Sequence, residues 1–232
     1  MLEVENLTVR YGPFLAVDEV AIRVEAGEIV GLVGANGAGK SSIVKTIGGV
    51  VVPLRGRVDF EGQDLAAVPP HRRIRLGISI VPEGRGLFPR MSVEENLLMG
   101  GYSLADKAQI ARNIERGFAL FPILAERRWQ AAGTLSGGQQ QMLAVAIGLM
   151  SDPKLLVLDE PSLGLAPIVI GEIGRALKSL RGQGLTVLLV EQNAKLTCNV
   201  SDRIYIVANG AIQHHDVSAN ILSNREILEL LI

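Results

Sequence analysis

Short apolar runs alternate with polar positions along the first part of the chain, and this spacing is typical of β-strands. The pattern predicts strands over residues 2–9, 21–24, 29–33, 56–60 and 78–81, with a turn at Glu61-Gly62. Residues 42–50 instead carry apolar side chains at helical spacing, directly after a glycine-rich stretch. The first 83 residues are therefore expected to form strands interrupted by one helix.

The pattern becomes helical between residues 92 and 150. A capping box, Ser92-Val93-Glu94-Glu95, predicts where this block starts, and we expect a helical run to about residue 122 that is broken only at Gly100-Gly101 and Gly117. Strands over 155–158, 186–190 and 204–207 follow, with a helix over 167–180. This order predicts an α/β chain whose core, residues 1–83 and 151–232, is divided by a helical insert over residues 84–150.

Composition narrows the function. The 232 residues are 48% hydrophobic but only 4% aromatic, which favours an aliphatic α/β core. A net charge of −1 argues against a nucleic-acid binder, because such proteins carry an excess of basic charge. No apolar run approaches the ~18 residues of a membrane span, and the first residues do not form a secretory signal. We expect a cytoplasmic chain whose one cysteine, Cys198, is reduced and buried or half-buried.

Residues 34–41 match the phosphate-binding pattern G-x-x-x-x-G-K-[ST] and stand between a predicted strand and a predicted helix, as that motif requires. Its glycines let backbone N–H groups turn toward anionic oxygens, and the helix adds the positive end of its dipole. Lys40 is expected to neutralise the β- and γ-phosphates, and Ser41 to place its hydroxyl on Mg²⁺. The predicted ATP contacts are Gly34, Ala35, Asn36, Gly37, Ala38, Gly39, Lys40, Ser41 and Ser42.

A second motif is the aliphatic strand that ends in Asp159 and Glu160. In phosphate-loop proteins such a strand end lies beside the loop, so Asp159 is expected to hold Mg²⁺ and Glu160 to polarise the attacking water. The structural alternative is a buried strand that runs into an exposed acidic turn. The presence of Lys40 in the same chain favours the catalytic interpretation.

A third motif is the run Leu135, Ser136, Gly137, Gly138 and Gln139. Ser136 is a natural N-cap, and residues 139–150 are apolar enough to predict a buried helix. The start of this helix is a second place suited to an anion, although a serine-glycine turn that simply caps a core helix is an equal alternative on these residues alone. One triphosphate does not need two helix N-termini of this kind, so we expect the second to bind the nucleotide of another copy or partner.

Along the chain the order is phosphate loop, signature (residues 135–139) and acidic strand end, and this ordered set resembles the ATP-binding subunits of ABC transporters over essentially the whole chain. It implies a P-loop NTPase (RecA-like) core with an antiparallel β-subdomain and the helical subdomain. It also implies a head-to-tail dimer with two ATP molecules between phosphate loop and signature, and a Tyr11 that stacks on adenine. Such a subunit would work on the inner face of the membrane, with a permease and, indirectly, with a periplasmic or extracellular solute-binding protein.

Residues 81–89, 160–167 and 190–194 are similar to the F-type ATPase of branched-chain amino-acid uptake systems. This subfamily carries Glu83 where most ABC ATPases have Gln, and Gln192 where most have His, so Glu83 becomes a candidate metal ligand and Gln192 a candidate catalytic residue. Ile147 departs from the pattern, because related chains usually carry Arg in the signature helix, and the sequence offers no functional account of it. The resemblance favours a heterodimer with a sibling ATPase but leaves an identical partner open.

Two alternatives stay open on the sequence. The cargo could be another small polar molecule such as urea or an amide, because the ATPase does not touch it. The chain could also be a low-turnover nucleotide-gated partner of a more active sibling. In either case a permease must dock, and we expect its surface along residues 83–92, with Leu87, Phe88 and Met91 exposed unless they serve ordinary packing.

Overall fold

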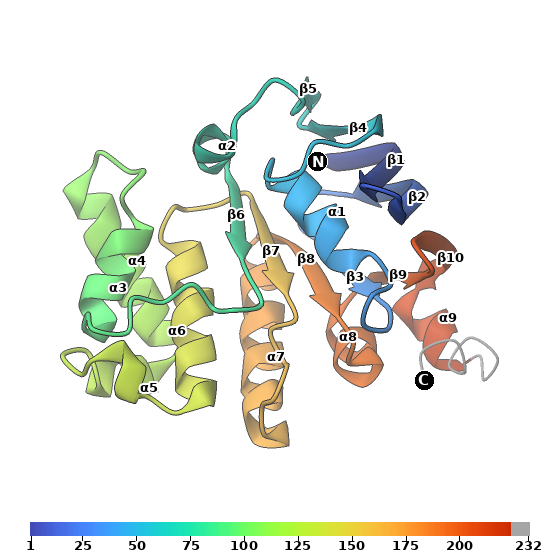
Figure 1. The fold of residues 1–232 in the computed structure, drawn as a ribbon. Coiled ribbons are helices and arrows are strands. Elements are labelled where there is room, and N and C mark those ends of the chain that lie inside the picture. The colour runs from blue at the N-terminus through green and yellow to red at the C-terminus, as the bar shows by residue number, and fades with distance from the viewer. Residues whose placement is uncertain (224–232) are drawn as a thin grey trace.

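A computed structural model describes residues 1–223 as two β-sheets with helices between and beside them (Figure 1). The smaller sheet has the order β2-β1-β4-β5 and is antiparallel throughout. Its strands are β1 (Leu2–Tyr11), β2 (Phe14–Val24), β4 (Arg55–Phe60) and β5 (Gln63–Asp64). This is the antiparallel β-layer that we expected.

The larger sheet has the order β10-β9-β3-β8-β7-β6. Five of its strands run parallel, namely β9 (Arg203–Ala208), β3 (Ile29–Val33), β8 (Thr186–Glu191), β7 (Leu155–Asp159) and β6 (Ile78–Val81). Only β10 (Ala211–Val217) is antiparallel to its neighbour. Because parallel strands end at the same edge, the segments after β3, β7 and β8 meet there.

Helix α1 (Lys40–Ile47) lies between the two sheets, where Ile43, Val44 and Ile47 are buried. Residues alternate across the larger sheet as its pleat requires, so Val157 of β7 faces this layer. Its neighbour Leu158 faces the opposite layer, which α6 (Gly137–Leu149) and α7 (Pro167–Gly182) cover. The two faces of one sheet thus contribute to two separate hydrophobic cores.

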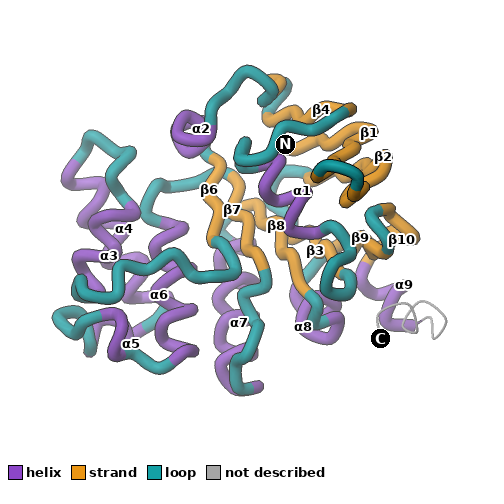
Figure 2. The backbone as a smooth tube through the Cα atoms, in the orientation of Figure 1, coloured by secondary structure: helices purple, strands orange, loops and turns teal. Residues whose placement is uncertain are grey.

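The predicted helical block is present beside the larger sheet, in green and yellow in Figure 1. It contains α3 (Val93–Gly100), α4 (Lys107–Leu120), α5 (Pro122–Glu126), the short 3₁₀ turn η1 (Ala132–Thr134) and α6. The boundaries of this block at residues 84 and 150 stay a prediction. Figure 2 shows the block as purple helices joined by teal loops, apart from the orange strands.

Several of the sequence-based elements need correction, and the main differences concern β2, α1 and the helical run. Strand β2 begins at Phe14 rather than residue 21, and α1 begins at Lys40 and ends before Gly48. The helical run is broken over residues 101–106, but Gly117 lies inside α4 and is buried. A Cβ at this position would lie 3.5 Å from the Cβ of Ala146 in α6, an ordinary contact distance, so Gly117 is a helical residue of the α4–α6 contact and does not break the helix.

Five described elements were not predicted from the sequence. They are β5, α2 (Pro70–Leu76), α8 (Ala194–Val200), β10 and α9 (Ser218–Ser223), the last of which ends the described part of the chain. All are short, and short elements are specified mainly by their tertiary neighbours. Cys198 lies in α8 and is buried, as expected.

Candidate functional site

The glycine-rich loop connects β3 to α1 in the predicted strand, loop and helix order. Gly37 and Gly39 have φ angles of 80° and 106°, a left-handed conformation that side chains disfavour. Gly34 is required for space, because a Cβ there would lie 2.2 Å from the backbone oxygen of Val207. The backbone conformation or the close packing thus explains why each of these positions is glycine, even before a ligand is considered.

Lys40, the first residue of α1, is buried with a side chain 3% exposed. Its ammonium donates hydrogen bonds to the carbonyl oxygens of Gly34 (2.7 Å) and Ala35 (3.0 Å). It also forms an ion pair with Glu160, Nζ to Oε1 3.2 Å. The three N–H groups of an ammonium thus face three oxygens, which holds the lysine over the loop.

Asp159 ends β7, and its neighbour Glu160 has a φ of 49°. Burial, followed by repulsion from Glu160 and Glu83, raises the pKa of the Asp159 carboxyl to about 6, while Lys40 and a hydrogen bond from Ser41 act in the opposite direction. Its Oδ1 is buried and has no hydrogen-bond partner. Burial and repulsion both disfavour a negative charge here, and a cation would offset both.

The loop, Lys40 and Glu160 line one pocket of about 390 Å³. Its walls are Tyr11, Phe14, Ala16, Asn36, Gly37, Gly39, Lys40, Ser41, Ser42, Glu83, Glu160 and Leu163. Nine of the predicted site residues are therefore brought together, although they come from β1, the phosphate loop and two separate turns. Gly34 and Ala38 are buried and Ala35 is exposed, and none of the three lines this pocket. Asp159 lines the neighbouring larger pocket.

The signature residues lie elsewhere. Of the described residues that line this pocket, none belongs to residues 135–139. Ser136 caps α6 in a capping box: its hydroxyl accepts from the Gln139 N–H, and the Gln139 side chain accepts from the Ser136 N–H. Leu135 is buried, Ser136 and Gly137 are exposed, and the predicted helix is buried from Gln141 to Ala146.

Comparison with known protein families identifies the family of this chain. The family described as ABC transporter matches residues 17–163, which is more than half of the chain and includes all three motifs. The chain belongs to the ABC transporter family. As an ABC-type ATP-binding subunit it is an ATPase, and it binds nucleotide.

Relatives of this ABC subunit match it along nearly its whole length. It is 47% identical over 227 residues to the high-affinity branched-chain amino acid transport ATP-binding protein BraG of Pseudomonas aeruginosa, covering 98% of this chain and 97% of that protein. A probable branched-chain amino acid transport ATP-binding protein LivF of Archaeoglobus fulgidus is 34% identical, with 99% and 98% covered. A nucleotide-free ATP-binding cassette from an ABC transporter superposes with a TM-score of 0.87 at 28% identity, covering 100% and 98%.

The fold of an ABC ATPase, a P-loop core with an antiparallel β-layer and a helical layer, is thereby confirmed. None of the helices within residues 1–223 is long and apolar enough to cross a bilayer. Across the same residues, no three His, Cys, Asp or Glu side chains are grouped as a metal site. Mg²⁺ prefers few protein ligands together with water and phosphate oxygens, so a hydroxyl and a carboxylate, Ser41 and Asp159, still fit it.

Of the finer predictions, Tyr11 lines the nucleotide pocket and Gln192 does not. Tyr11 is 44% exposed at the pocket wall and faces Phe14 across the β1–β2 hairpin; Phe14 is 62% exposed. Sequence reasoning missed Phe14, although two aromatic residues that flank Gly12-Pro13 were a usable signal. Gln192 follows β8 and is exposed, and it is not among the described pocket residues, so its catalytic role stays a prediction.

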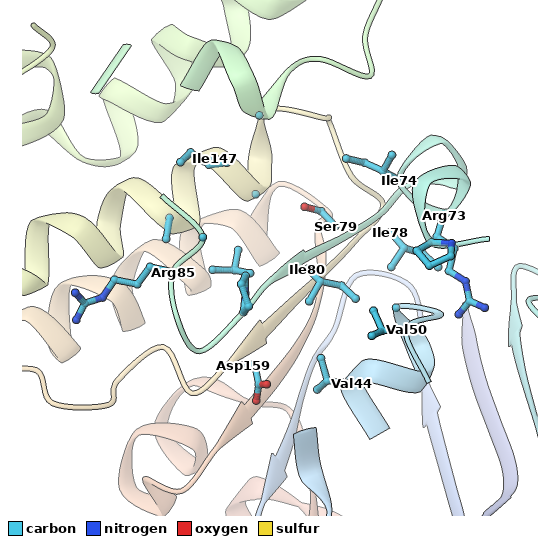
Figure 3. Close-up of a pocket in the computed structure, with 18 of the residues that line it drawn as sticks. Val44, Val50, Arg73, Ile74, Ile78, Ser79, Ile80, Arg85, Ile147 and Asp159 are labelled. Atoms are coloured by element: carbon cyan, nitrogen blue, oxygen red, sulfur yellow. The ribbon is translucent and has the colours of Figure 1, made fainter. Parts of the chain in front are cut away.

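A second and larger pocket, about 710 Å³, lies between α1, β6 and the helical block (Figure 3). Figure 3 shows Ile147 on α6 facing across this pocket toward Ile78 and Ile80 of β6 and Val44 of α1. Phe88 also lines it and is 47% exposed, whereas Leu87 and Met91 are half-buried. Ile147, for which the sequence offered no account, is thus part of an apolar wall.

Proposed function

We propose that this ABC-type subunit hydrolyses ATP with Mg²⁺ to drive a membrane permease that imports branched-chain amino acids. The choice of branched-chain amino acids as cargo is supported by the 47% identity, over almost the full length of both chains, to a branched-chain amino acid transport ATP-binding protein. The observation that supports hydrolysis is the closeness of Lys40 to Glu160 at the mouth of the phosphate loop. Urea, amides and other small polar molecules are the alternative cargoes.

In this proposal Lys40 binds the β- and γ-phosphates, for which a charge-assisted hydrogen bond is well suited. Glu160 orients the attacking water and accepts its proton. Ser41 and Asp159 hold the Mg²⁺, with Glu83 as a further candidate at the pocket wall. Bound Mg²⁺ supplies charge neutralisation at the phosphate oxygens. Tyr11, with Phe14 beside it, gives the adenine a surface to stack on.

The exposed start of α6 supports a head-to-tail dimer. Ser136 and Gly137 are exposed and lie outside the pocket of their own chain, so they are free to meet the γ-phosphate bound by another ATPase subunit. A helix N-terminus carries partial positive charge and suits that anion. The second subunit is a sibling chain or an identical copy.

The pocket of Figure 3 supports a docking place for the permease on the inner face of the membrane. Its walls are mainly apolar, with Ile147, Phe88 and Met99 on the side of the helical block. Lys45, Arg73 and Arg85 add positive charge, against the one carboxylate of Asp159 among the described lining residues. An amphipathic helical segment with an acidic residue would match both features. The solute-binding protein would then act only through the permease.

Reconstitution of the chain in proteoliposomes with its permease and second ATPase subunit, and with the solute-binding protein outside, tests this proposal. Wild type should take up labelled leucine only with internal ATP and Mg²⁺, and Glu160→Gln should bind ATP normally but abolish uptake and prolong an ATP-bound dimer. Glu61→Gln, which changes an exposed glutamate of the β4–β5 turn, is the matched control and should retain uptake. ATP-dependent uptake of urea but not of leucine would overturn the choice of branched-chain amino acids as cargo. Hydrolysis that persists in Glu160→Gln would overturn the role given to Glu160.

The same preparation separates two further outcomes. If Glu160→Gln stays monomeric with ATP and Mg²⁺, a sibling ATPase should be mixed in, and dimer formation then identifies a heterodimer. Ile147→Glu should reduce co-purification with the permease, whereas Trp129→Glu, at an apolar side chain 74% exposed, should not. Wild-type turnover that is negligible even in the assembled complex would favour the low-turnover partner instead.

A further inference from the structure

Glu191, the last residue of β8, is a buried carboxylate for which the proposed mechanism has no use. Only 2% of it is exposed. Its Oε1 accepts a hydrogen bond from the backbone N–H of Ser162 at 2.8 Å. Its Oε2 accepts from the Ser162 hydroxyl at 2.8 Å and from the Asn193 N–H at 3.2 Å.

Both oxygens of this carboxylate therefore face a backbone N–H group. A glutamine in its place would turn an NH₂ group toward one of these donors, whichever way the amide was placed, because only one of its two terminal atoms accepts. The site is selective for a group that accepts on both sides. Burial raises the pKa of the Glu191 carboxyl, and the hydrogen bonds from Ser162 and Asn193 act against that rise.

The backbone around Glu191 contacts two of the catalytic segments. Its carbonyl oxygen accepts from the N–H of Gly34, the first residue of the phosphate loop, at 3.3 Å. The preceding carbonyl, that of Val190, accepts from the N–H of Glu160 at 2.8 Å. The register of the parallel strands explains this, since Val33 pairs with Glu191 and Asp159 pairs with Val190.

Ser162 stands two residues after Glu160, and the next residue, Leu163, lines the nucleotide pocket. On its other side Glu191 adjoins Gln192, which is followed by Asn193, whose side chain caps α8 by accepting from the Leu196 N–H at 3.0 Å. The carboxylate thus ties the turn after Glu160 to both neighbours of Gln192. Glu160 itself has a left-handed φ of 49°, a conformation that must be maintained by its surroundings.

We propose that Glu191 is a positioning residue for ATP hydrolysis, whose carboxylate fixes the turn after Glu160 and so holds Glu160 against Lys40. This inference rests on the proposed ATPase function. It assigns the network to the hydrolytic step, because the atoms that Glu191 holds belong to the Glu160 turn. A residue that only satisfied a buried turn would affect stability without a selective effect on turnover.

The test compares Glu191→Gln and Ser162→Ala in the full chain, assembled with its permease if that is needed for turnover. For Glu191→Gln we expect kcat to fall at least about tenfold while the equilibrium affinity for ATP stays within about threefold of wild type. Ser162→Ala should lower kcat less, because its backbone N–H still reaches Glu191. The double variant should resemble Glu191→Gln, since both changes remove the same contact.

Two variants at a distance from the site serve as controls. Ser218→Ala removes a buried serine hydroxyl that donates to the Ser201 carbonyl at 2.6 Å. Glu28→Gln changes a glutamate, 15% exposed, that pairs with Arg203 beside the start of β3, at the other edge of the sheet. Both should lower the melting temperature and leave kcat within about twofold of wild type.

Unchanged kcat in folded Glu191→Gln would overturn the inference, as would a parallel loss of kcat, ATP affinity and melting temperature. If Glu191→Gln does not fold, Ser162→Ala decides: a kcat equal to that of Ser218→Ala would overturn the inference. Absence of hydrolysis by the assembled wild type would instead refute the proposed function, which makes the two failures distinguishable.

Discussion

The buried ion pair between Lys40 and Glu160 makes a prediction about stability that is independent of nucleotide. Lys40 is 3% exposed and Glu160 is 8% exposed, so neither charge is screened by solvent to a useful extent. Replacing Lys40 with methionine keeps the volume of the side chain but leaves the Glu160 carboxylate uncompensated. Removal of one partner of such a pair costs about 3–5 kcal/mol.

We therefore expect Lys40→Met to lower the free energy of unfolding by about 3 kcal/mol in the absence of ATP. Glu160→Gln alone should cost about 1 kcal/mol, because the amide oxygen still accepts from Lys40 but without its charge. Added to Lys40→Met, Glu160→Gln should restore about 1–2 kcal/mol, since no unpaired charge is then left in the site. The expected coupling energy is about 2 kcal/mol or more.

Urea unfolding of the wild type, both single variants and the double variant measures this cycle. The exposed pair between Lys154 and Glu61, with side chains 55% and 42% exposed, provides a control cycle in the same protein. Its coupling energy should stay below about 1 kcal/mol. The reasoning is refuted if the two cycles give the same coupling, or if Glu160→Gln further destabilises Lys40→Met.

Three other predictions concern the nucleotide. Ser136→Arg should leave ATP affinity of the monomer unchanged and abolish turnover, because Ser136 is exposed and outside its own pocket; loss of binding by the isolated chain would contradict this. Gln192→His should add an ionisation near pH ~6.5 to the pH–rate profile, which the amide of the wild type lacks, and an unchanged profile would place Gln192 away from the reacting phosphate. Glu83→Gln should make ATP affinity less dependent on Mg²⁺, because it removes a carboxylate that repels Asp159 and the triphosphate; identical Mg²⁺ titrations would remove Glu83 from the metal site.

The local chemistry of this protein follows from the sequence alone. The strand, glycine loop and helix around Lys40, the acidic end of β7 and the capping box at Ser136 are all local patterns. Each is specified by residues within about ten positions, through φ angles, caps and apolar spacing. This is why the fold class and the position of each motif were predictable, together with the family.

Tertiary structure decided which distant residues meet. Phe14 reaches the pocket wall through the turn of a hairpin, and Gly117 stays helical and buried inside α4, where α4 packs against α6. The position of Ile147 in the wall of the larger pocket depends on how α6 packs beside β6. Glu191 reaches Ser162, 29 positions away in the chain, because β7 and β8 are parallel neighbours whose ends share one edge. Such contacts depend on register and packing between elements, and no local spacing in the sequence specifies them.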